Sequence, residues 1–441
     1  MRLKTVATYF ALLVSACLLS PCNAADEVEV VTFRGATMGT TYQIKVASPP
    51  ATPGYYATTS LAIERELRLV NDQMSTYLKS SEISRFNASA STDWFPVSPE
   101  TAQVVSFALE ISETTGGAFD VTVGPLVNLW SFGPESRDRQ LPSSDAISDA
   151  KRNVGYRHLH ARLEPPAIRK DLPELEVDLS AIAKGHGVDR IVALLTSAGS
   201  SRAPVEDVFV EIGGEVRVTG SKGITQWKVG IQTPDSIAPS ILAAVPLEDD
   251  AMATSGDYRN FFEVDGKRFS HTIDPITGSP VSHQLASATV IAPTCMAADA
   301  WATALTVLGP DRGRDLIAAN NLNVLLVQRD DDDFTLTGTG LLEPFAVADV
   351  SNAGSTTFSQ QLIPVALMTL VGITTILIAM AIGVIFGRRA ISGSCGGLNN
   401  TQSSDGAKTG SCSLCSQPTE ACSALRKQVE QASTPAGAGI E

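Results

Sequence analysis

One segment of the chain restricts its possible folds more than any other, because residues 362–386 contain no Asp, Glu, Lys or Arg. As a helix rising about 1.5 Å per residue, this run is long enough to cross roughly 30 Å of hydrocarbon with some tilt. It therefore predicts a transmembrane helix. Arg388 and Arg389 follow it directly, whereas acidic residues precede it, so the positive-inside rule places residues 387–441 in the cytoplasm.

The N-terminus has the layout of a secretory signal. Two basic residues precede an uncharged run at 5–19, which is too short to span a bilayer comfortably. We expect a signal peptide at 1–25, and the alternative is a lipoprotein box with lipidation at Cys17. In either case residues 26–350 are exported, which predicts a protein of the bacterial inner membrane with a periplasmic domain and a cytoplasmic tail.

Charge and cysteine content limit what the exported part can do. The formal net charge of −14 argues against nucleic acid as the main partner. Only Cys295, of seven cysteines, lies within residues 26–350, so the exported domain has no disulfide and must be held by its core. A domain of this length can bury such a core. The polar stretch at 351–361 is the predicted linker to the membrane helix.

Periodicity predicts mixed α and β structure in the exported domain. Strands are expected at 40–46, 208–218, 227–232 and 324–328, and helices at 58–77, 99–115 and 296–308. In the first helix, Leu61, Leu67, Leu69 and Val70 are expected to face the core. The elements do not follow a βαβ rhythm, which favours an α+β fold. The sequence contains no Walker A loop, no GxGxxG between a strand and a helix, and no repeat of 20 to 50 residues.

The segment 270–305 contains the residues best suited to chemistry. Asp299 and Thr303 are four residues apart in a predicted helix, so they share a face and can offer two oxygens to one Mg²⁺. His271, with an ordinary pKa of about 6.5, is suited to accept a proton at neutral pH. The alternatives are that the pair consists of surface residues and that the histidine stabilises the turn at Asp274 and Pro275.

Eight short motifs in a fixed order give the sequence a family resemblance. They are GATMGT (35–40), MSTY (74–77), GGAFDV (116–121), DLSAIAKG (178–185), GGEV (213–216), SGDY (255–258), HTIDPITG (271–278) and DAWAT (299–303). In these motifs, over residues 34–342, the chain resembles the ApbE family, the FAD:protein FMN transferases. The resemblance implies a two-lobed α+β flavin transferase domain. Such enzymes use FAD and Mg²⁺, join the FMN phosphate to a threonine hydroxyl of a target protein through a phosphoester bond, and release AMP.

The resemblance also implies site residues, position by position. The FAD contacts would be Met38, Tyr77, Ala118, Phe119, Asp120, Asp178, Lys184 and Ile273. The metal would be held by Ala181, Asp299, Ala302 and Thr303, and His271 would be the catalytic base. Two positions depart from the family pattern. His186 replaces a frequent aromatic residue, and Ala302 offers only a backbone carbonyl where a carboxylate can occur.

The tail carries a second resemblance. Cys395, Cys412, Cys415 and Cys422 would lie in a reducing compartment, where thiolates favour iron or zinc over disulfides. A disordered tail that binds no metal is the alternative. Residues 382–422, with SCGGL at 394–398 after the membrane helix, are similar to NqrM, a family needed to mature the Na⁺-translocating NADH:quinone reductase and implicated in its iron supply.

Together the two resemblances imply that both parts of the chain serve the same target complex. The flavin-acceptor subunits of that reductase, or of a related Rnf-type complex, are the expected partners. Two other functions stay open at this point. The exported domain could bind FAD or hydrolyse it to FMN and AMP, or the whole chain could be a noncatalytic membrane assembly factor.

Overall fold

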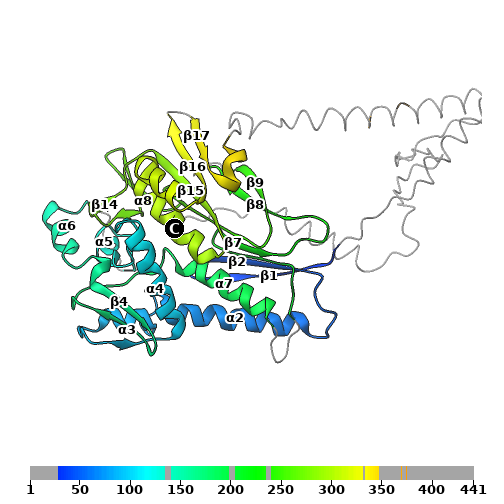
Figure 1. Cartoon of the computed structure of the whole chain (residues 1–441), viewed down its shortest axis with the longest axis horizontal. Coiled ribbons are helices and arrows are strands. Elements are labelled where there is room, and N and C mark those ends of the chain that lie inside the picture. The colour runs from blue at the N-terminus through cyan, green and yellow to red at the C-terminus, as the bar shows by residue number, and fades with distance from the viewer. Residues whose placement is uncertain are drawn as a thin grey trace, which may run out of the picture. The chain divides into compact units, whose positions relative to one another are not determined.

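The computed structural model describes residues 28–134, 141–197, 204–234, 240–330 and 333–346, together with Thr369 and Thr374 (Figure 1). The chain divides into two compact units, Met1–Ile363 and Pro364–Glu441. Among the described residues, no helix is long and apolar enough to cross a membrane. The signal at 1–25, the linker at 351–361 and the tail cysteines lie outside the described residues. So does the predicted membrane helix, apart from the two threonines.

An eight-stranded antiparallel sheet forms the centre of the first unit (Figure 1). Its strands, in spatial order, are β1 (Val30–Thr37), β2 (Thr40–Ala47), β6 (Val208–Ile212), β7 (Glu215–Thr219), β10 (Ala251–Gly256), β15 (Leu285–Ala292), β16 (Asn323–Asp330) and β17 (Asp333–Gly338). Every residue of β15 is buried, and most are Ala, Ser, Thr or Val. Small side chains in this strand allow other elements to pack closely on both faces of the sheet.

Two helices cover one face of the sheet and a hairpin covers the other. Helix α7 (Ala183–Thr196) packs on β6 and β7, and α8 (Cys295–Ala319) packs on β10 and β15. On the opposite face, β8 (Trp227–Gln232) and β9 (Ile241–Leu247) alternate buried and exposed residues and enclose an apolar cluster with the sheet and the 3₁₀ helix η2 (Gly340–Phe345). The central sheet is therefore sandwiched between two apolar layers, as in other layered α+β domains.

A second lobe is built around a small sheet. It contains α3 (Glu82–Ala88), α4 (Pro99–Thr114), α5 (Gly124–Leu129), α6 (Ser144–Lys151), η1 (Tyr156–His158) and a three-stranded sheet of β3 (Phe95–Pro96), β5 (Pro166–Lys170) and β4 (Leu159–Leu163). Helix α2 (Tyr55–Met74) leads into it from the first lobe. Two short hairpins complete the chain: β11 (Phe261–Val264) with β12 (Lys267–Ser270), and β13 (Ile273–Asp274) with β14 (Ser279–Pro280).

Helix α8 is interrupted near its middle. Gly309 has φ 72° and ψ 176°, which is outside the helical region, and Pro310 follows it. A side chain at Gly309 would clash with the ring of His283. Glycine tolerates this backbone conformation, and proline can begin the next helical turn because it has no amide hydrogen to pair there. The helix therefore acts as two segments with different neighbours.

The predicted elements are confirmed, with one error in their packing. Each expected element is present in type, but the strand expected at 208–218 is an antiparallel pair, β6 and β7, with a turn at Gly213 and Gly214. The helix expected at 58–77 is α2, which ends at Met74, and α8 extends past the predicted end at residue 308. In α2, Leu67 and Val70 are buried as expected. Leu61 and Leu69 are 65% and 41% exposed, so their assignment to the core was wrong. Ile63 and Met74 take the core positions instead, because the helix presents a narrower apolar stripe than the leucine count indicates.

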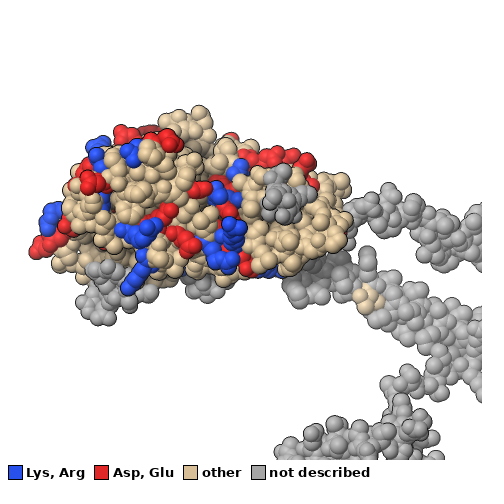
Figure 2. Space-filling model, turned by 90° about the horizontal axis from the view of Figure 1, so that it is seen from below, with Lys and Arg blue, Asp and Glu red and all other residues tan. Residues whose placement is uncertain are grey.

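The surface around α2 carries charges of both signs. On the face seen in Figure 2, acidic and basic side chains are interspersed. Arg190 of α7 pairs with Glu66 of α2 at 2.5 Å and with Glu100 of α4 at 3.3 Å. These pairs connect three helices from the two lobes. The contacts are partly buried, so solvent screens them less than ordinary surface pairs.

Candidate active site

A cavity of about 430 Å³ lies between the two lobes, and the predicted site residues meet in it. Its lining includes every residue expected to contact FAD: Met38, Tyr77, Ala118, Phe119, Asp120, Asp178, Lys184 and Ile273. His271, Ala181, Asp299 and Thr303 also line it. Ala302 is the predicted residue that does not. It is fully buried, and its carbonyl accepts a hydrogen bond from Thr306 Oγ1 at 2.8 Å.

Tight turns bring several of these residues to the cavity. Met38 and Gly39 form the two-residue turn between β1 and β2, with φ values of 48° and 71°. Positive φ at both positions matches the twist of a hairpin, but it is unusual for methionine. The Met38 side chain packs against Gly187 of α7, where an added Cβ would lie 2.9 Å from the methionine methyl carbon. The glycine therefore makes room for Met38 at the cavity wall.

The segment after α4 places Asp120 in the cavity wall. Gly116 and Gly117 end α4 in left-handed conformations, and the Gly117 amide donates to the Ser112 carbonyl at 2.8 Å. Asp120 accepts from the Thr122 amide and hydroxyl with one oxygen and from the Tyr156 amide with the other. Burial raises the pKa of Asp120, and these hydrogen bonds oppose the rise. Its carboxylate thus also holds the local backbone in place.

The start of α7 is shaped by a residue from α8. The Gly185 amide lies in the first turn of α7, where backbone amides have no partner within the helix, and it donates to Asp299 Oδ2 at 3.0 Å. An added Cβ at Gly185 would lie 2.4 Å from the Cys295 carbonyl oxygen, so only glycine allows the helices to approach this closely. The bond fixes Asp299 against the first turn of α7.

Three charged side chains meet at this point. Lys184 Nζ lies 2.6 Å from Glu215 Oε1 and 3.7 Å from Asp299 Oδ1. Burial raises the pKa of Asp299 to about 7, with the charge of Glu215 adding to the rise and that of Lys184 opposing it. For Lys184 burial alone would lower the pKa, but the charges of Asp299 and Glu215 outweigh it and the pKa is raised. One ammonium therefore faces two carboxylates in a largely buried setting.

The residues around this cluster fit a Mg²⁺ ion, although the described residues contain no group of three or more His, Cys, Asp or Glu side chains placed to hold a metal. Hard cations prefer oxygen ligands. Asp299, Thr303 and Ala181 line the cavity, so a carboxylate, a hydroxyl and a backbone carbonyl are the oxygens that could bind such a cation. A bound cation would also favour the ionised form of Asp299, whose pKa burial raises to about 7.

His271 lies in the cavity wall with a defined tautomer. The carbonyl of Asn260 accepts from the His271 amide at 3.0 Å and lies 3.1 Å from Nδ1. Because a carbonyl cannot donate, this contact requires the proton on Nδ1 and leaves the Nε2 lone pair to accept. The histidine therefore does not stabilise the turn at Asp274 and Pro275, as the structural alternative supposed. Burial is the main cause that lowers its pKa below 6.5, and nearby Lys184 and Arg259 add to the effect.

Some cavity residues were not assigned a role from the sequence. Glu215, Arg259, Asn260 and Phe132 line the cavity. Arg259 donates to the Gly213 carbonyl at 2.7 Å, and its guanidinium lies so close to Gly214 that an added Cβ would come within 2.8 Å of it. Glu215 and Arg259 stand within or directly after the GGEV and SGDY motifs, which was the available signal. Phe132, edge-on to His271, lies outside all eight motifs.

His186, the residue that replaces an aromatic, is buried near the start of α7. Burial lowers its pKa to about 4, and the charge of Arg190 adds to this effect. It is therefore neutral at physiological pH. His186 does not line the cavity. Its replacement of an aromatic residue therefore changes the packing around the site and not the cavity wall.

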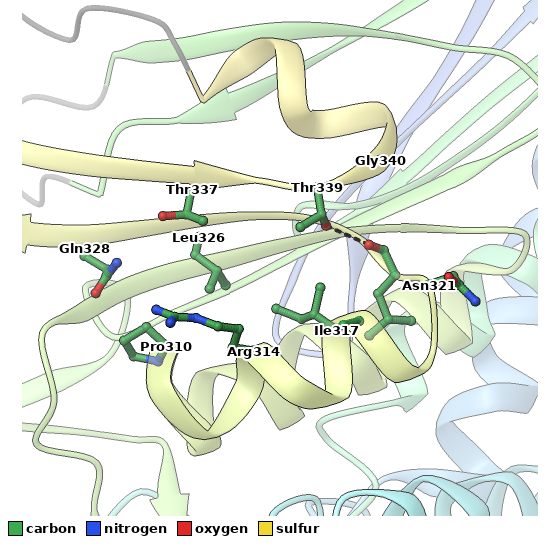
Figure 3. Close-up of a pocket in the computed structure, with 11 residues that line it drawn as sticks. Pro310, Arg314, Ile317, Asn321, Leu326, Gln328, Thr337, Thr339 and Gly340 are labelled. Carbon is green, nitrogen blue, oxygen red and sulfur yellow. Dashed lines mark hydrogen bonds between the residues drawn. The ribbon is translucent and has the colours of Figure 1, made fainter.

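A second cavity, of about 390 Å³, lies at the far end of α8 and shares no lining residue with the first (Figure 3). Figure 3 shows Arg314 and Ile317 extending from the second segment of α8 toward Leu326 and Gln328 of β16. Arg314 is its one charged lining residue. Polar groups do not converge here as they do between the lobes, so we place the chemistry in the first cavity.

Comparison with known proteins gives a consistent result. The model of the ApbE family matches residues 38–326. The FAD:protein FMN transferase of Vibrio cholerae is 44% identical over 334 residues, which cover 76% of this chain and 97% of that protein. The FAD:protein FMN transferase of Escherichia coli is 37% identical over 355 residues, covering 78% and 98%.

Solved structures agree with these sequence matches. The flavin transferase ApbE from Vibrio cholerae superposes with a TM-score of 0.65 at 42% identity, covering 72% of this chain and 99% of that one. The apo form of the flavinyl transferase ApbE from Pseudomonas stutzeri superposes with a TM-score of 0.64 at 34% identity, covering 72% and 97%. The similarity therefore spans nearly the whole of both relatives.

Proposed function

The chain belongs to the ApbE family and is an enzyme of the FAD:protein FMN transferase type, and we propose that the cavity between its lobes transfers FMN from FAD to a threonine of a membrane-protein subunit. One observation carries the proposal. A histidine with an available Nε2, two cationic side chains and the Asp299–Thr303 pair line the same cavity. The transfer of a phosphoryl group between two oxygens requires this combination of a base and positive charge.

The residues divide the reaction between them. Lys184 and Arg259 neutralise the FAD diphosphate in a protein that is otherwise acidic. His271 Nε2 accepts the proton of the threonine hydroxyl as its oxygen attacks the phosphorus next to the riboflavin. A bond forms between this oxygen and phosphorus, and the bond from phosphorus to the oxygen bridging the two phosphates breaks. AMP leaves with that oxygen, so atoms and charge balance without another reactant.

Mg²⁺ is part of the proposal. Asp299, Thr303 and the Ala181 carbonyl would hold it, and the Ala302 carbonyl predicted from the family pattern would have to exchange its bond with Thr306 to take part. When bound, the ion supplies positive charge to the phosphate oxygens, where negative charge develops. Thr303 and Asp299 stand one helical turn apart, so the first segment of α8 fixes their spacing.

The direct test uses the purified protein with FAD, Mg²⁺ and a flavin-acceptor subunit of the Na⁺-translocating NADH:quinone reductase. Mass spectrometry of the acceptor measures covalent FMN, and chromatography measures free FMN. We expect the threonine to gain FMN with release of one AMP. Free FMN without modified acceptor would identify a hydrolase instead, and neither product would indicate a noncatalytic assembly factor.

A variant of the base tests the residue assignment. His271→Ala should lower the transfer rate by about 10²- to 10⁴-fold, the usual contribution of a general base. The dissociation constant for FAD, measured by flavin fluorescence, should change little because Lys184 and Arg259 remain. An unchanged transfer rate would show that another group accepts the proton.

We also propose that the catalytic domain is periplasmic and that the chain is held in the bacterial inner membrane by residues 362–386. The uncharged run and the following arginines support this topology. The cytoplasmic cysteines Cys395, Cys412, Cys415 and Cys422 would then aid iron delivery to the same reductase or a related Rnf-type complex. Reductase subunits from cells that lack this protein should have neither covalent FMN nor a full iron content. Normal FMN attachment and normal iron content in these subunits would contradict the proposal that the protein matures this reductase.

A further inference from the structure

The starts of α7 and α8 are fastened to each other by two carboxylates, one from each helix. Asp189 of α7 accepts from the Cys295 amide through Oδ1 and from the Met296 amide through Oδ2, both at 2.9 Å. In the opposite direction, Asp299 of α8 accepts from the Gly185 amide at 3.0 Å. Each carboxylate therefore bonds to first-turn amides of the other helix, which have no partner within their own helix.

The two contacts have the same spacing along their helices. Asp189 stands four residues after Gly185 in α7, and Asp299 stands four residues after Cys295 in α8. Residues four apart lie about one turn apart on the same face of a helix. Both contacts therefore lie on the faces along which the helices meet. The backbones are close enough at this point that an added Cβ at Gly185 would lie 2.4 Å from the Cys295 carbonyl oxygen.

Asp189 fixes both the position and the rotation of α8. Its two oxygens hold two successive amides, so the start of α8 can neither slide nor turn against α7 without breaking a bond. A negative charge is also favourable at a helix N-terminus, where the dipoles of the peptide units point their positive ends. Arg217 of β7 donates to Asp189 Oδ1 at 2.7 Å and balances its charge. The contact therefore joins α7, α8 and the central sheet.

Helix α8 has a second cap of a different kind. The Thr294 hydroxyl, directly before the helix, accepts from the Ala297 amide at 3.3 Å. This bond joins two residues at the start of the same helix, so it stabilises α8 without attaching it to α7. Asp189 does both, and the two caps can therefore be compared experimentally.

We propose that Asp189 is a positioning residue for the cation site of the proposed transfer reaction. It sets the register of α8 against α7, and so the place of Asp299 and Thr303 relative to Ala181. These two α8 residues follow Cys295 by about 6 and 12 Å along the helix axis, so a shift at the helix start moves both. The inference rests on the proposed function and adds a residue that does not line the cavity.

The test is Asp189→Asn, compared with the unmodified enzyme by calorimetric titration with Mg²⁺ in the absence of FAD. A carboxamide has a single acceptor oxygen, so one of the two amides loses its partner and faces an NH₂ group instead. We expect the Kd for Mg²⁺ to rise about 10- to 100-fold, the usual cost of losing a group that orients a metal ligand. The kcat/KM for transfer should fall as well, because a small misplacement of the site slows the reaction.

Two control variants separate positioning from charge and from stability. Asp189→Glu keeps the charge but moves the oxygens by one methylene, and since a site must be held within about 0.5 Å, its Kd for Mg²⁺ should rise about threefold or more. Thr294→Ala removes the local cap of α8 and should lower Tm while the Kd for Mg²⁺ stays within twofold. All titrations are made at a temperature at which circular dichroism shows each variant to be folded.

Three results would overturn the proposal. A Kd within twofold of the unmodified enzyme for both Asp189 variants would show that α8 keeps its register without this carboxylate. Weaker binding in Asp189→Asn with no change in Asp189→Glu would show that only the charge matters. An equal loss in Thr294→Ala would attribute the effect to helix stability.

Two further outcomes are read separately. If Asp189→Asn does not fold, Asp189→Glu decides the question alone, because it retains the charge at the helix start. If the unmodified enzyme binds no Mg²⁺, the metal part of the proposed function fails before any variant is compared, whereas transfer of FMN is judged by its own assay.

Discussion

Helix α8 contributes to two cavities of similar volume, and they differ in nearly everything else. Its first segment, with Asp299, Thr303 and Val307, lines the cavity of about 430 Å³ between the lobes. Its second segment, with Pro310 and Arg314, lines the cavity of about 390 Å³ shown in Figure 3. Volume alone does not tell the two apart.

What separates them is how their polar groups are used. In the first cavity, Lys184 lies within 4 Å of the carboxylates of both Glu215 and Asp299 in a largely buried setting. In the second, Thr339 accepts from the Val324 amide and donates to the Leu322 carbonyl, so it stabilises its own backbone. Burying unbalanced charge costs stability unless a ligand or ion compensates it. The first cavity is thus built for a charged ligand, and the second for the packing of α8 on the sheet.

The largest effect that tests this contrast is expected at Asp299. Asp299→Asn keeps an oxygen for the Gly185 amide but removes the charge that faces Lys184. Transfer should fall about 10²- to 10³-fold, the usual cost of losing one pre-organised electrostatic contact. Calorimetric titration with Mg²⁺ should show weaker binding in the absence of FAD, which separates a metal role from a purely structural one.

Lys228→Met, on the exposed face of the β8–β9 hairpin, is the matched charge control for that variant and should change neither measurement. If Asp299→Asn and the unmodified enzyme bind Mg²⁺ with equal affinity, Asp299 is not a ligand of the metal. The contrast between the cavities would then depend on the base and the cations alone.

The sequence predicted this cavity well because most of its residues lie on short, ordered motifs. Several motifs contain a tight turn or a helix start, where Gly39 has a positive φ and Gly185 leaves no room for a side chain. Few residue types fit at such positions, so they can be identified from the motifs in the sequence. The predicted strands and helices agreed for a similar reason, since alternation and helical periodicity are local properties.

Other features could not be predicted from the sequence, because they depend on distant contacts. The exposure of Leu61 and Leu69 follows from how α2 is rotated against α7 and β1. Phe132 approaches His271 only after the two lobes have packed together, at a centroid distance of 6.3 Å. The preference of the Gly185 amide for Asp299 likewise joins residues 114 positions apart. Local sequence patterns do not predict such contacts between residues that are far apart in the chain.

A smaller effect is expected at Arg259. Arg259→Gln removes a cation next to Lys184 and His271 that nothing in the family resemblance had assigned. Loss of one charge-assisted hydrogen bond to phosphate, worth about 1.5 to 3 kcal/mol, corresponds to roughly a 10- to 100-fold lower kcat/KM. Steady-state assays with FAD and the acceptor measure this.

Arg259→Lys is the informative partner of that variant. It keeps the charge, but a single ammonium cannot reproduce the planar fork that bonds to Gly213 and faces the cavity. Its kcat/KM should lie between those of the glutamine variant and the unmodified enzyme. If both variants stay within twofold of the unmodified enzyme, Lys184 alone carries the diphosphate.

The acid limit of activity reports on His271. Its pKa is lowered from 6.5, mainly by burial, so the neutral form that accepts a proton persists to lower pH than in free imidazole. On the acid side kcat/KM should therefore fall only below pH 6.5, where His271 becomes protonated. The assay is run at saturating Mg²⁺, which keeps Asp299 ionised although burial raises its pKa to about 7, so a fall that begins above pH 6.5 would contradict the assignment of His271 as the base. Measuring Tm over the same pH range separates the loss of activity from unfolding.

The smallest effect is expected in the second cavity, and it is the strictest check on the comparison. Arg314 is exposed and is the one charge lining that cavity. Arg314→Gln should leave kcat/KM within twofold, because the break at Gly309 separates this segment from the one that holds Asp299 and Thr303. Surface substitutions of this kind usually change stability by no more than about 0.5 kcal/mol.

A connection between the two segments nevertheless exists. Arg312 lies in the second segment and pairs with Asp274, in the turn that follows His271, the proposed base. If Arg314→Gln lowers transfer severalfold while Tm is unchanged, motion of the second segment must reach the base through Arg312. Arg312→Gln in the same assay would then reproduce the loss. The two cavities would have to be treated as one coupled system, in which α8 transmits the state of one to the other across its glycine break.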